Sequence, residues 1–147
     1  MLQIRELEKD DLLPLLALYT HLHDNPMPAM DEALLMKWGY ILSDPNHHII
    51  GGFLADQLIS SCVLLIVPNL THNQRPYALI EHVITHEAYR GHGYAMSVLQ
   101  FAKALAQKRN CYKIMLMTSS QKESTLMFYE RAGYNRHDKT AFIQWLS

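Results

Sequence analysis

The sequence predicts one α/β domain, and three stretches carry that prediction. Residues 48–67 hold two runs rich in β-branched and apolar side chains, separated by a short polar turn, as expected of paired strands. Residues 77–85 form a further run of the same kind. A glycine turn follows it, and over 93–108 apolar residues recur at the spacing of one helix face. The 147 residues suffice for one buried core and no linker divides them, so a single domain over 1–147 is expected.

The first part of the chain predicts two helices between strands. Asp10 and Asp11 can cap a helix that runs to about His23, because apolar residues share one face of it. These residues are Leu12, Leu15, Leu16, Tyr19 and Leu22. The proline-containing stretch 24–28 ends this helix. The elements expected here are a strand over 2–7, helices over 10–23 and 31–42, strands over 48–55 and 58–67, and a polar loop over 68–76.

The second part predicts strands and helices in alternation. Lys113–Met117 is apolar on both faces, which is typical of a central strand. Ser120 and Glu123 have the spacing of a capping box, so a helix is expected to begin there, and Gly133 suits the left-handed position after its end. The elements expected are a strand over 77–85, a helix over 93–108, a strand over 113–117, a helix over 121–132, and strands over 134–136 and 140–146.

Composition and charge argue against several classes of function. A net charge of −1 gives no reason to expect nucleic acid or an anionic membrane as a partner. The N-terminus lacks the apolar stretch of a signal peptide, and no apolar run reaches the roughly 18 residues that span a bilayer. Cys62 and Cys111 lie in apolar runs and suit a reducing compartment, so a cytoplasmic protein is expected. The paired histidines lack cysteine or carboxylate companions at ligand spacing, so no metal site is expected.

The most informative motif is Arg90-Gly91-His92-Gly93-Tyr94-Ala95, which lies between a predicted strand and a predicted helix. Its two glycines let the backbone turn tightly, and the first N–H groups of the helix point outward with the positive end of the dipole. This arrangement predicts a pyrophosphate site. A dinucleotide fingerprint would need a small residue at Met96, and the Gly-Lys-Ser/Thr end of a P-loop is absent.

This motif resembles the Gln/Arg-x-x-Gly-x-Gly/Ala signature of the GNAT superfamily of acetyl-coenzyme A-dependent N-acetyltransferases. A second match is Phe128-Tyr129-Glu130-Arg131-Ala132-Gly133-Tyr134, and the order of elements agrees over nearly the whole chain. The resemblance implies the acyl-CoA N-acyltransferase fold, with a mixed, mostly antiparallel central sheet, a splayed parallel strand pair and flanking helices.

Within the superfamily, Ile80-Glu81 before the turn is most similar to glucosamine-6-phosphate and small-amine N-acetyltransferases. The amino-sugar enzymes usually carry Glu-Asp or Glu-Asn where this chain has Glu81-His82. They often carry Leu-Asp-Cys where it has Leu116-Met117-Thr118. The amino-sugar substrate is therefore not carried over.

The resemblance also implies how acetyl-coenzyme A would bind. The pantetheine arm would pair with the backbone of Val83 and Ile84, in the gap between two splayed strands. Arg90 would contact the phosphates or tie down the loop. The remaining residues of the cofactor site, most of them donating backbone N–H groups to the pyrophosphate, would be Gly91, His92, Gly93, Tyr94, Ala95 and Phe128.

Acetyl transfer to an amine needs a base, because a typical amine is protonated at neutral pH. Glu81 and His82 are the candidates, and as neighbours on a strand only one can face the acceptor unless a bulge intervenes. Tyr129 matches the tyrosine that protonates the leaving thiolate. The structural alternatives are that Glu81 pairs with Arg75 or Lys113, that His82 packs within the strand, and that Tyr129 is a core aromatic.

The sequence thus predicts an N-acetyltransferase that moves acetyl from acetyl-coenzyme A to a primary amine by direct attack in a ternary complex, with a small-molecule amine as partner. No cysteine is expected in the site. The alternatives are a protein N-terminal or lysine acetyltransferase, and a non-catalytic acetyl-coenzyme A sensor. Homodimers are common in the superfamily. Four apolar residues near the C-terminus would either form such an interface or close the sheet: Phe142, Ile143, Trp145 and Leu146.

Overall fold

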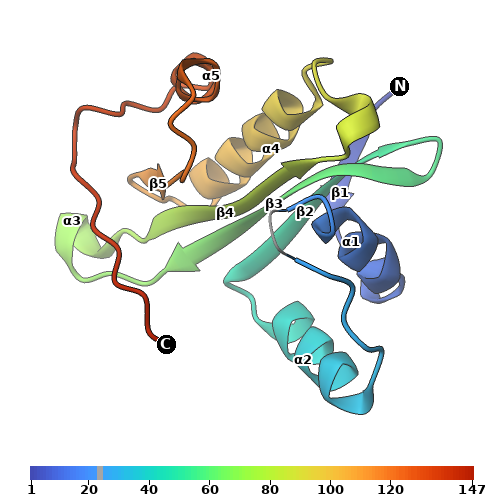
Figure 1. The fold of residues 1–147 in the computed structure, drawn as a ribbon. Helices are drawn as coiled ribbons and strands as arrows, with labels where there is room; N and C mark the ends of the chain where they lie inside the picture. The colour runs from blue at the N-terminus through green and yellow to red at the C-terminus, as the bar shows by residue number, and fades with distance from the viewer. Residues whose placement is uncertain (23–24) are drawn as a thin grey trace.

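The computed structural model describes residues 1–22 and 25–147, and within them five strands form one sheet in the order β1-β2-β3-β4-β5 (Figure 1). The strands are β1 (Gln3–Glu6), β2 (His47–Leu54), β3 (Gln57–Val67), β4 (Tyr77–Thr85) and β5 (Ile114–Leu116). The helices are α1 (Leu12–Tyr19), α2 (Glu32–Ser43), α3 (Thr71–Gln74), α4 (Tyr94–Lys108) and α5 (Glu123–Arg131), with the short 3-10 turns η1 (Lys9–Asp11) and η2 (Glu87–Tyr89). None of the described helices is both long and apolar enough to cross a membrane.

The sheet is antiparallel except at its last pair. Strands β1 to β4 run antiparallel to their neighbours, while β5 lies parallel to β4. The β4–β5 register joins Ala78 with Ile114 and Ile80 with Leu116, and it stops there although β4 continues to Thr85. The two strands therefore part over the second half of β4. The predicted mixed, mostly antiparallel sheet with a splayed parallel pair is confirmed.

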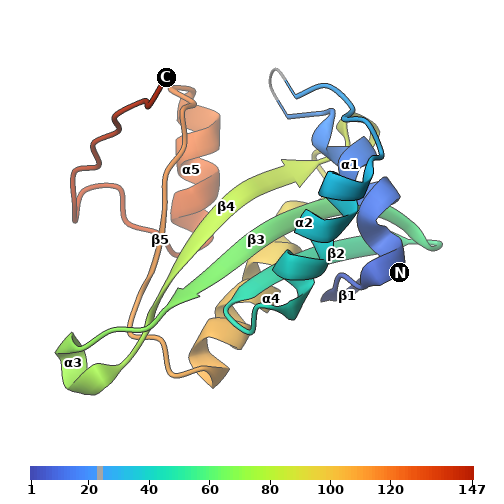
Figure 2. The same cartoon turned by 90° about the horizontal axis from the view of Figure 1, so that it is seen from below.

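Helices cover both faces of the sheet and create two apolar layers (Figure 2). On the face covered by α1 and α2, Leu15, Trp38 and Ile49 belong to one buried cluster. On the face covered by α4, Ile50 and Val98 belong to a second. Since Ile49 and Ile50 are adjacent in β2, these layers follow the two-residue period of a strand that is buried on both faces.

Two parts of the N-terminal half differ from the sequence prediction. Helix α1 ends at Tyr19, whose carbonyl accepts hydrogen bonds of 3.0 Å from both the Leu22 N–H and the Asn25 side chain. The predicted end at His23 lies outside the described residues. The segment expected as a loop over 68–76 contains the short α3, in which His72 and Asn73 adopt left-handed backbone conformations.

The C-terminal segment, residues 132–147, forms no strand, so the strands predicted over 134–136 and 140–146 are wrong. Its large apolar side chains are 66–90% exposed: Phe142, Ile143, Trp145 and Leu146. Among the described strands, β5 consequently lies at the sheet edge with half-buried side chains, and the prediction of a central strand is wrong. Just after the helix, Arg136 contacts Glu123 at 2.6 Å and Glu130 at 3.1 Å in an ion-pair cluster on α5, so the chain lies beside the helix at this point.

The same cluster explains why the predicted capping box is wrong. The Glu123 carboxylate binds Arg136 and does not turn back to the start of α5. Lys122 is the N-cap residue, and Ser120 instead accepts a 3.3 Å hydrogen bond from the Lys122 N–H. At the other end of α5, Gly133 has a φ of +101°, as predicted for the residue that follows the helix.

Candidate active site

Strand β4 is bulged in the middle of its pairing with β3. The register joins Glu81 with Val63 and Ile84 with Ser61, so two residues of β4 lie opposite Cys62 alone. The first of these two residues is His82, whose φ of +52° lies in the left-handed region. A bulge of this kind disrupts the ladder locally and changes the direction in which side chains point.

The bulge brings the side chains of Glu81 and His82 into one cavity on the α1/α2 face. In a regular strand the two would point to opposite faces, and a bulge is the exception that the sequence analysis left open. After the bulge the alternation resumes in the shifted phase. Val83 packs with the apolar layer under α4, and Ile84 belongs to the layer under α1.

The cavity measures about 260 Å³ and lies between α1, α2 and strands β2 to β4. Most of its lining is apolar, from Leu12, Leu15, Leu16, Leu34, Trp38, Ile41, Ile49, Val63 and Leu65. The other residues that line it are Tyr19, Lys37, His47, Glu81 and His82. The cavity therefore combines an apolar wall with a few titratable groups, which is the usual composition of a small-molecule site.

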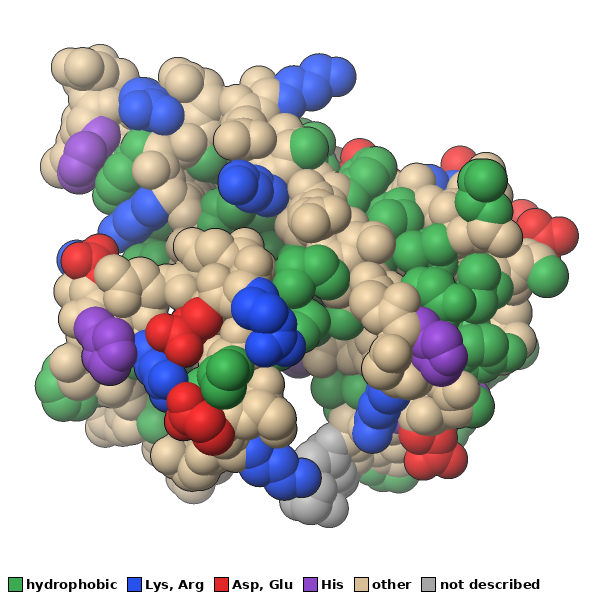
Figure 3. Space-filling model, turned by 90° about the horizontal axis from the view of Figure 1, so that it is seen from above, with side chains coloured by type: hydrophobic (Ala, Val, Ile, Leu, Met, Phe, Trp, Pro, Cys, Tyr) green, Lys and Arg blue, Asp and Glu red, His purple; other side chains and the backbone are tan. Residues whose placement is uncertain are grey.

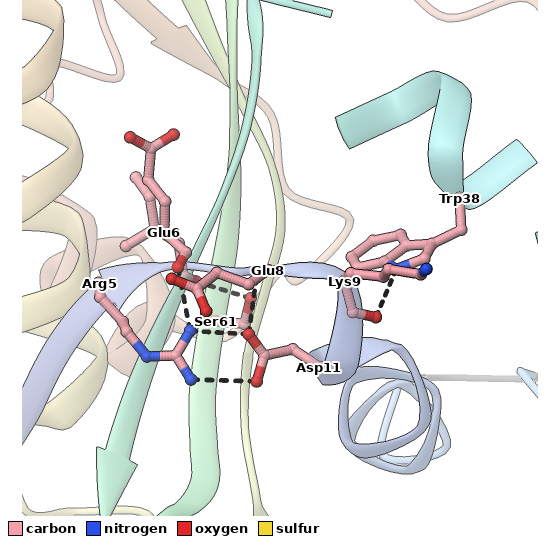
Figure 4. Close-up of polar contacts among 8 residues, drawn as sticks. Arg5, Glu6, Glu8, Lys9, Asp11, Trp38 and Ser61 are labelled. Atoms are coloured by element: carbon pink, nitrogen blue, oxygen red, sulfur yellow. Dashed lines mark hydrogen bonds and ion pairs between the residues drawn. The ribbon is translucent and has the colours of Figure 1, made fainter. Parts of the chain in front are cut away.

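One wall of the cavity is fixed by hydrogen bonds around the start of α1 (Figure 4). The Trp38 indole N–H donates a 3.0 Å hydrogen bond to the Lys9 carbonyl, which ties α2 to η1. Arg5 binds Asp11 through two hydrogen bonds of 2.7 and 3.0 Å, and Asp11 also accepts from the Glu8 N–H at 2.7 Å. The hydrogen bonds from Arg5 lower the pKa of Asp11. Trp38 is only 5% exposed, so it forms a rigid wall.

Burial keeps two further titratable groups in the cavity neutral. Burial lowers the pKa of His47, which favours the uncharged imidazole. Burial also raises the pKa of Tyr19, whose ring lies 5.6 Å from that of His82 between centroids. His47 was not among the site residues predicted from the sequence, and Tyr19 was predicted only as a core residue. The two-residue period of β2 is the signal for His47, because it places this residue on the same face as Ile49.

The two cations that were considered as structural partners of Glu81 are engaged elsewhere. Arg75 donates hydrogen bonds of 3.2 Å to the carbonyls of Asn110 and Cys111. The Lys113 ammonium lies 5.3 Å from the ring centroids of both Tyr77 and Tyr112.

Cys62 does not line the cavity, because its side chain belongs to the apolar layer under α4. It stands opposite the bulge of β4, on the central strand β3. Its side chain is fully buried, and burial raises the pKa of the thiol to about 12. Because a thiol must ionise to act as a nucleophile, Cys62 is a packing residue.

Beyond the bulge, the free edge of β4 faces the gap that opens toward β5. The Ile84 carbonyl accepts a 3.2 Å hydrogen bond from the Ser60 hydroxyl, and the His86 N–H donates to the Ile59 carbonyl, so both face β3. Backbone groups alternate between the two edges of a strand, which directs those of Val83 toward the gap. Of the two residues expected to pair with a pantetheine arm, Val83 therefore has the suitable orientation.

The glycine turn follows β4 and η2 and leads directly into α4. Gly91 and Gly93 have φ values of +81° and +79°, and Gly93 is the N-cap residue of α4. A Cβ at either glycine would have no neighbour within 4 Å, so open space lies above the turn. The first intrahelical bond runs from the Ser97 N–H to the Gly93 carbonyl, at 3.1 Å. The preceding N–H groups at this helix end are suited to an anion, and a diphosphate fits this open turn.

Side chains of the motif hold the turn in shape. The Arg90 Nε donates a 3.0 Å hydrogen bond to the Thr85 carbonyl, which is the loop-tying role considered for this residue. The His92 Nδ1 lies 2.9 Å from the Arg90 carbonyl, and its ring stacks on Tyr94 at 5.6 Å between centroids. Ala95 lies in the first turn of α4.

Tyr129 lies on α5, on the opposite side of the sheet from the cavity. It packs with Phe128, at 5.1 Å between ring centroids, against the apolar layer under α4. Burial raises the pKa of Tyr129, so its phenol is protonated at neutral pH. The surface is hollowed between α5, on the left of Figure 3, and the α1 side on the right. Glu81 and His82 thus lie on one side of β4, and Tyr129 lies on the other.

Known proteins resemble this chain in sequence and in fold. The acetyltransferase (GNAT) family matches residues 3–134. The chain is 30% identical over 92 residues to the streptothricin acetyltransferase of Escherichia coli, a match that covers 63% of the chain and 49% of that enzyme. The chain therefore spans about half the length of this curated relative.

Solved structures share the fold over the whole chain. An Agrobacterium tumefaciens str. C58 protein assigned as an acetyltransferase has a TM-score of 0.90 and 35% identity, covering 97% of this chain and 99% of that chain. The glucosamine-6-phosphate N-acetyltransferase of Arabidopsis thaliana has a TM-score of 0.86 over 100% of this chain and 99% of that chain, but its 18% identity shows the fold alone. Since the family match includes both the glycine turn and α5, the chain belongs to the acetyltransferase (GNAT) family.

Proposed function

We propose that the protein transfers acetyl from acetyl-coenzyme A to a small primary amine, by direct attack within a ternary complex. The observation that carries this proposal is the bulge in β4. It places Glu81 and His82 in one cavity, next to the gap beside Val83. An amine acceptor requires a carboxylate or imidazole at the position where the acyl donor and the cavity meet.

The donor would lie along the gap and the glycine turn. Acetyl-coenzyme A, when bound, supplies an acetyl thioester with an electrophilic carbonyl carbon. The Val83 backbone would pair with its pantetheine arm and donate an N–H to the thioester oxygen, where charge develops during attack. The N–H groups from Gly91 to Ala95 would hold its diphosphate. These donors are already oriented, so little rearrangement accompanies binding.

On the acceptor side, Glu81 and His82 have different tasks in this proposal. The Glu81 carboxylate attracts the ammonium form of the amine into the cavity. Histidine is the side chain that exchanges protons near neutral pH, so His82 removes the proton directly or through a water molecule. The free amine then forms a bond to the acetyl carbon, and the nitrogen loses its second proton to solvent as the amide forms.

On the donor side, the carbon–sulfur bond breaks as the amide forms, and the leaving thiolate needs a proton. The Tyr129 phenol, which burial keeps protonated, donates that proton and regains one from solvent. The inert thiol of Cys62 supports direct transfer over an acetylated cysteine intermediate.

The test is thiol release from acetyl-coenzyme A in the presence of primary amines, with calorimetry of coenzyme A binding alongside. Glu81→Gln should raise KM for the amine more than it lowers kcat, because it removes the charge that attracts the ammonium group. Failure to bind acetyl-coenzyme A would overturn the proposal. Binding without turnover on any amine or peptide would favour the sensor alternative.

A protein acceptor is the other candidate within the same chemistry. A peptide substrate would need an open groove that admits backbone on both sides of the reacting residue. The cavity beside Glu81 is instead closed on one side by the fixed Trp38 wall, which supports a small amine. Acetylation of short peptides at rates above those of small amines would reverse this preference.

We propose further that two copies associate through the C-terminal segment, residues 132–147. Its four large apolar side chains are 66–90% exposed, and an apolar surface of this kind usually marks an interface. Its sequence has the strand-like composition noted above, while β5 forms a sheet edge among the described strands. An open sheet edge accepts an extended segment by main-chain pairing. In the proposed dimer, each copy pairs its C-terminal segment with the β5 edge of the other copy.

A further inference from the structure

We infer that the acceptor is a compact primary amine with an apolar body, such as an arylalkylamine or a branched alkylamine. This inference rests on the proposed function, because it assigns the acceptor to the cavity that Glu81 and His82 face. Three properties of that cavity support the inference: its lining, its charged groups and its size.

The lining of the cavity favours a substrate with an apolar body over one with a polar body. Leucine, isoleucine, valine and tryptophan supply most of the wall, and the Trp38 indole N–H is already bonded to the Lys9 carbonyl at 3.0 Å. Besides Trp38, only Tyr19, Lys37, His47, Glu81 and His82 carry polar side-chain atoms in this lining, so most hydroxyl groups of an amino sugar would be buried against aliphatic side chains without partners. Burial of a polar group without a hydrogen bond is unfavourable, whereas burial of methylene groups is favourable.

The charges favour a single ammonium group and no phosphate. Among the described residues that line the cavity, Glu81 is the only carboxylate, so it can neutralise one ammonium. Lys37, on α2, would repel the second ammonium of a polyamine. It is also the only permanent cation among these residues, and His47 is neutral because burial lowers its pKa. A phosphate would therefore lack the clamp of several cations that usually holds it.

The size favours a molecule with one ring or a short branched chain. Cavities that hold drug-sized ligands usually measure about 300–1,000 Å³, and this one measures about 260 Å³. The Trp38 side chain in its wall is held by the hydrogen bond to the Lys9 carbonyl in η1, so the cavity does not widen easily on this side. With the amino group at Glu81 and His82, the apolar body would extend toward Trp38 and Leu34, between α1 and α2.

The test compares amines matched in size. Values of kcat/KM, based on the total amine concentration because the ammonium form is the one that binds, would be measured for ethylamine, propylamine, butylamine and 2-phenylethylamine. Each buried methylene should raise kcat/KM by about fourfold. Propylamine should exceed ethanolamine, which has the same number of heavy atoms, by about tenfold or more. Glucosamine 6-phosphate and spermidine should be poor acceptors.

A pair of variants on α2 locates the effect in the cavity. Leu34 lines the cavity, whereas its neighbour Leu35 is 52% exposed and does not. Leu34→Asn should narrow the ratio of kcat/KM between 2-phenylethylamine and ethylamine, because it makes the apolar wall polar. Leu35→Asn places the same residue type in the same helix, and it should leave that ratio unchanged.

The outcomes separate this inference from the proposed function. Equal rates along the alkyl series, or a preference for the sugar phosphate or polyamine, would overturn the apolar acceptor and leave the acetyltransferase activity standing. An unchanged ratio in Leu34→Asn would also overturn it. If acetyl-coenzyme A binds and no amine is acetylated, the proposed function itself fails.

Discussion

Glu81 and His82 are consecutive in β4, yet both side chains open into the same cavity. His82 has a φ of +52° and forms, with Val83, a bulge opposite Cys62. Without the bulge, one of the two side chains would point to the face that α4 covers. The bulge therefore assembles a carboxylate and an imidazole on one side of the strand, beside the gap where β5 departs.

Replacement of His82 should separate its proton-transfer role from its backbone role. Asparagine tolerates a positive φ better than most residues, so His82→Asn should keep the bulge and lose the base. Its kcat/KM should fall by about 100-fold near pH 7. The loss should shrink toward about pH 10, because a larger fraction of the amine is then free without a base. Initial rates across this pH range provide the measurement.

A β-branched residue at the same position is the matched control. His82→Val should strain the left-handed backbone and destabilise the fold, which thermal unfolding would show. If the deficit of His82→Asn stays constant as pH rises, His82 is not the base.

Replacement of Tyr129 by Phe should lower kcat by about tenfold to 100-fold and leave coenzyme A affinity unchanged. The phenol is protonated at neutral pH because burial raises its pKa, so it can donate to the leaving thiolate. Steady-state kinetics measure kcat, and calorimetry measures the affinity for coenzyme A. Tyr40→Phe, at a position that is 73% exposed on α2, is the control and should change neither. Equal losses in rate and affinity would mean that Tyr129 acts by packing.

The glycine turn and the helix after it could be predicted from the sequence because residue type alone specifies them. Gly91 and Gly93 adopt left-handed conformations that other residues avoid, and the apolar period over 93–108 reappears as α4 (Tyr94–Lys108). The splayed strand pair was expected from the family resemblance. It is seen in the register that stops at Ile80.

The bulge and the C-terminal segment could not be predicted in the same way. Histidine adopts a positive φ more often than most residue types, but only a few per cent of non-glycine residues do so, and residue type alone therefore does not predict it. The bulge at His82 depends on how β3 pairs with β4. The strand-like composition of 140–146 is present in the sequence. A strand also needs a partner edge, and composition does not specify one; in the structure Arg136 pairs with Glu123 and Glu130 of α5, and the segment does not join β5. The two-residue period of β2 places His47 on the same face as Ile49, but the cavity that both residues line exists only once α1 and α2 are in place.

Gly93→Ala should weaken acetyl-coenzyme A binding. At a φ of +79° an alanine is strained by about 1–2 kcal/mol, and its Cβ would enter the open space above the turn. KM for acetyl-coenzyme A should rise by about tenfold or more, because the loss of one backbone hydrogen bond to a charged group has an effect of this order. Gly39→Ala is a matched control in α2, where a Cβ meets nothing within 4 Å. It should leave KM unchanged and stabilise the protein by about 0.5–1 kcal/mol. Unchanged KM in Gly93→Ala would argue against a diphosphate at this turn.

The Arg5–Asp11 pair should make stability depend on pH. Hydrogen bonds from Arg5 lower the pKa of Asp11 in the folded protein, so the pair stabilises the fold above the unfolded pKa of about 3.9. That contribution is lost as pH falls through the lowered folded pKa. Asp11→Asn should reduce the free energy of unfolding at pH 7 by roughly 1–2 kcal/mol. The difference from wild type should diminish in strong acid. Urea denaturation at pH 7 and in strong acid measures this difference in the free energy of unfolding. A difference that persists in acid would mean that the substitution acts through lost packing and not through the lost charge.

The C-terminal segment should determine the oligomeric state. In an extended strand, Phe142 and Trp145 lie on opposite faces, so a partner sheet that receives the segment would bury at least one of them. The double substitution Phe142→Lys and Trp145→Lys should therefore convert a dimer into a monomer, because a buried ammonium is unfavourable. Met36→Lys, at a position on α2 that is 71% exposed, is the matched control and should leave the dimer intact. Sedimentation equilibrium measures the mass of all three proteins. A wild-type protein that stays monomeric at high concentration, or a double variant that stays dimeric, would contradict association through this segment.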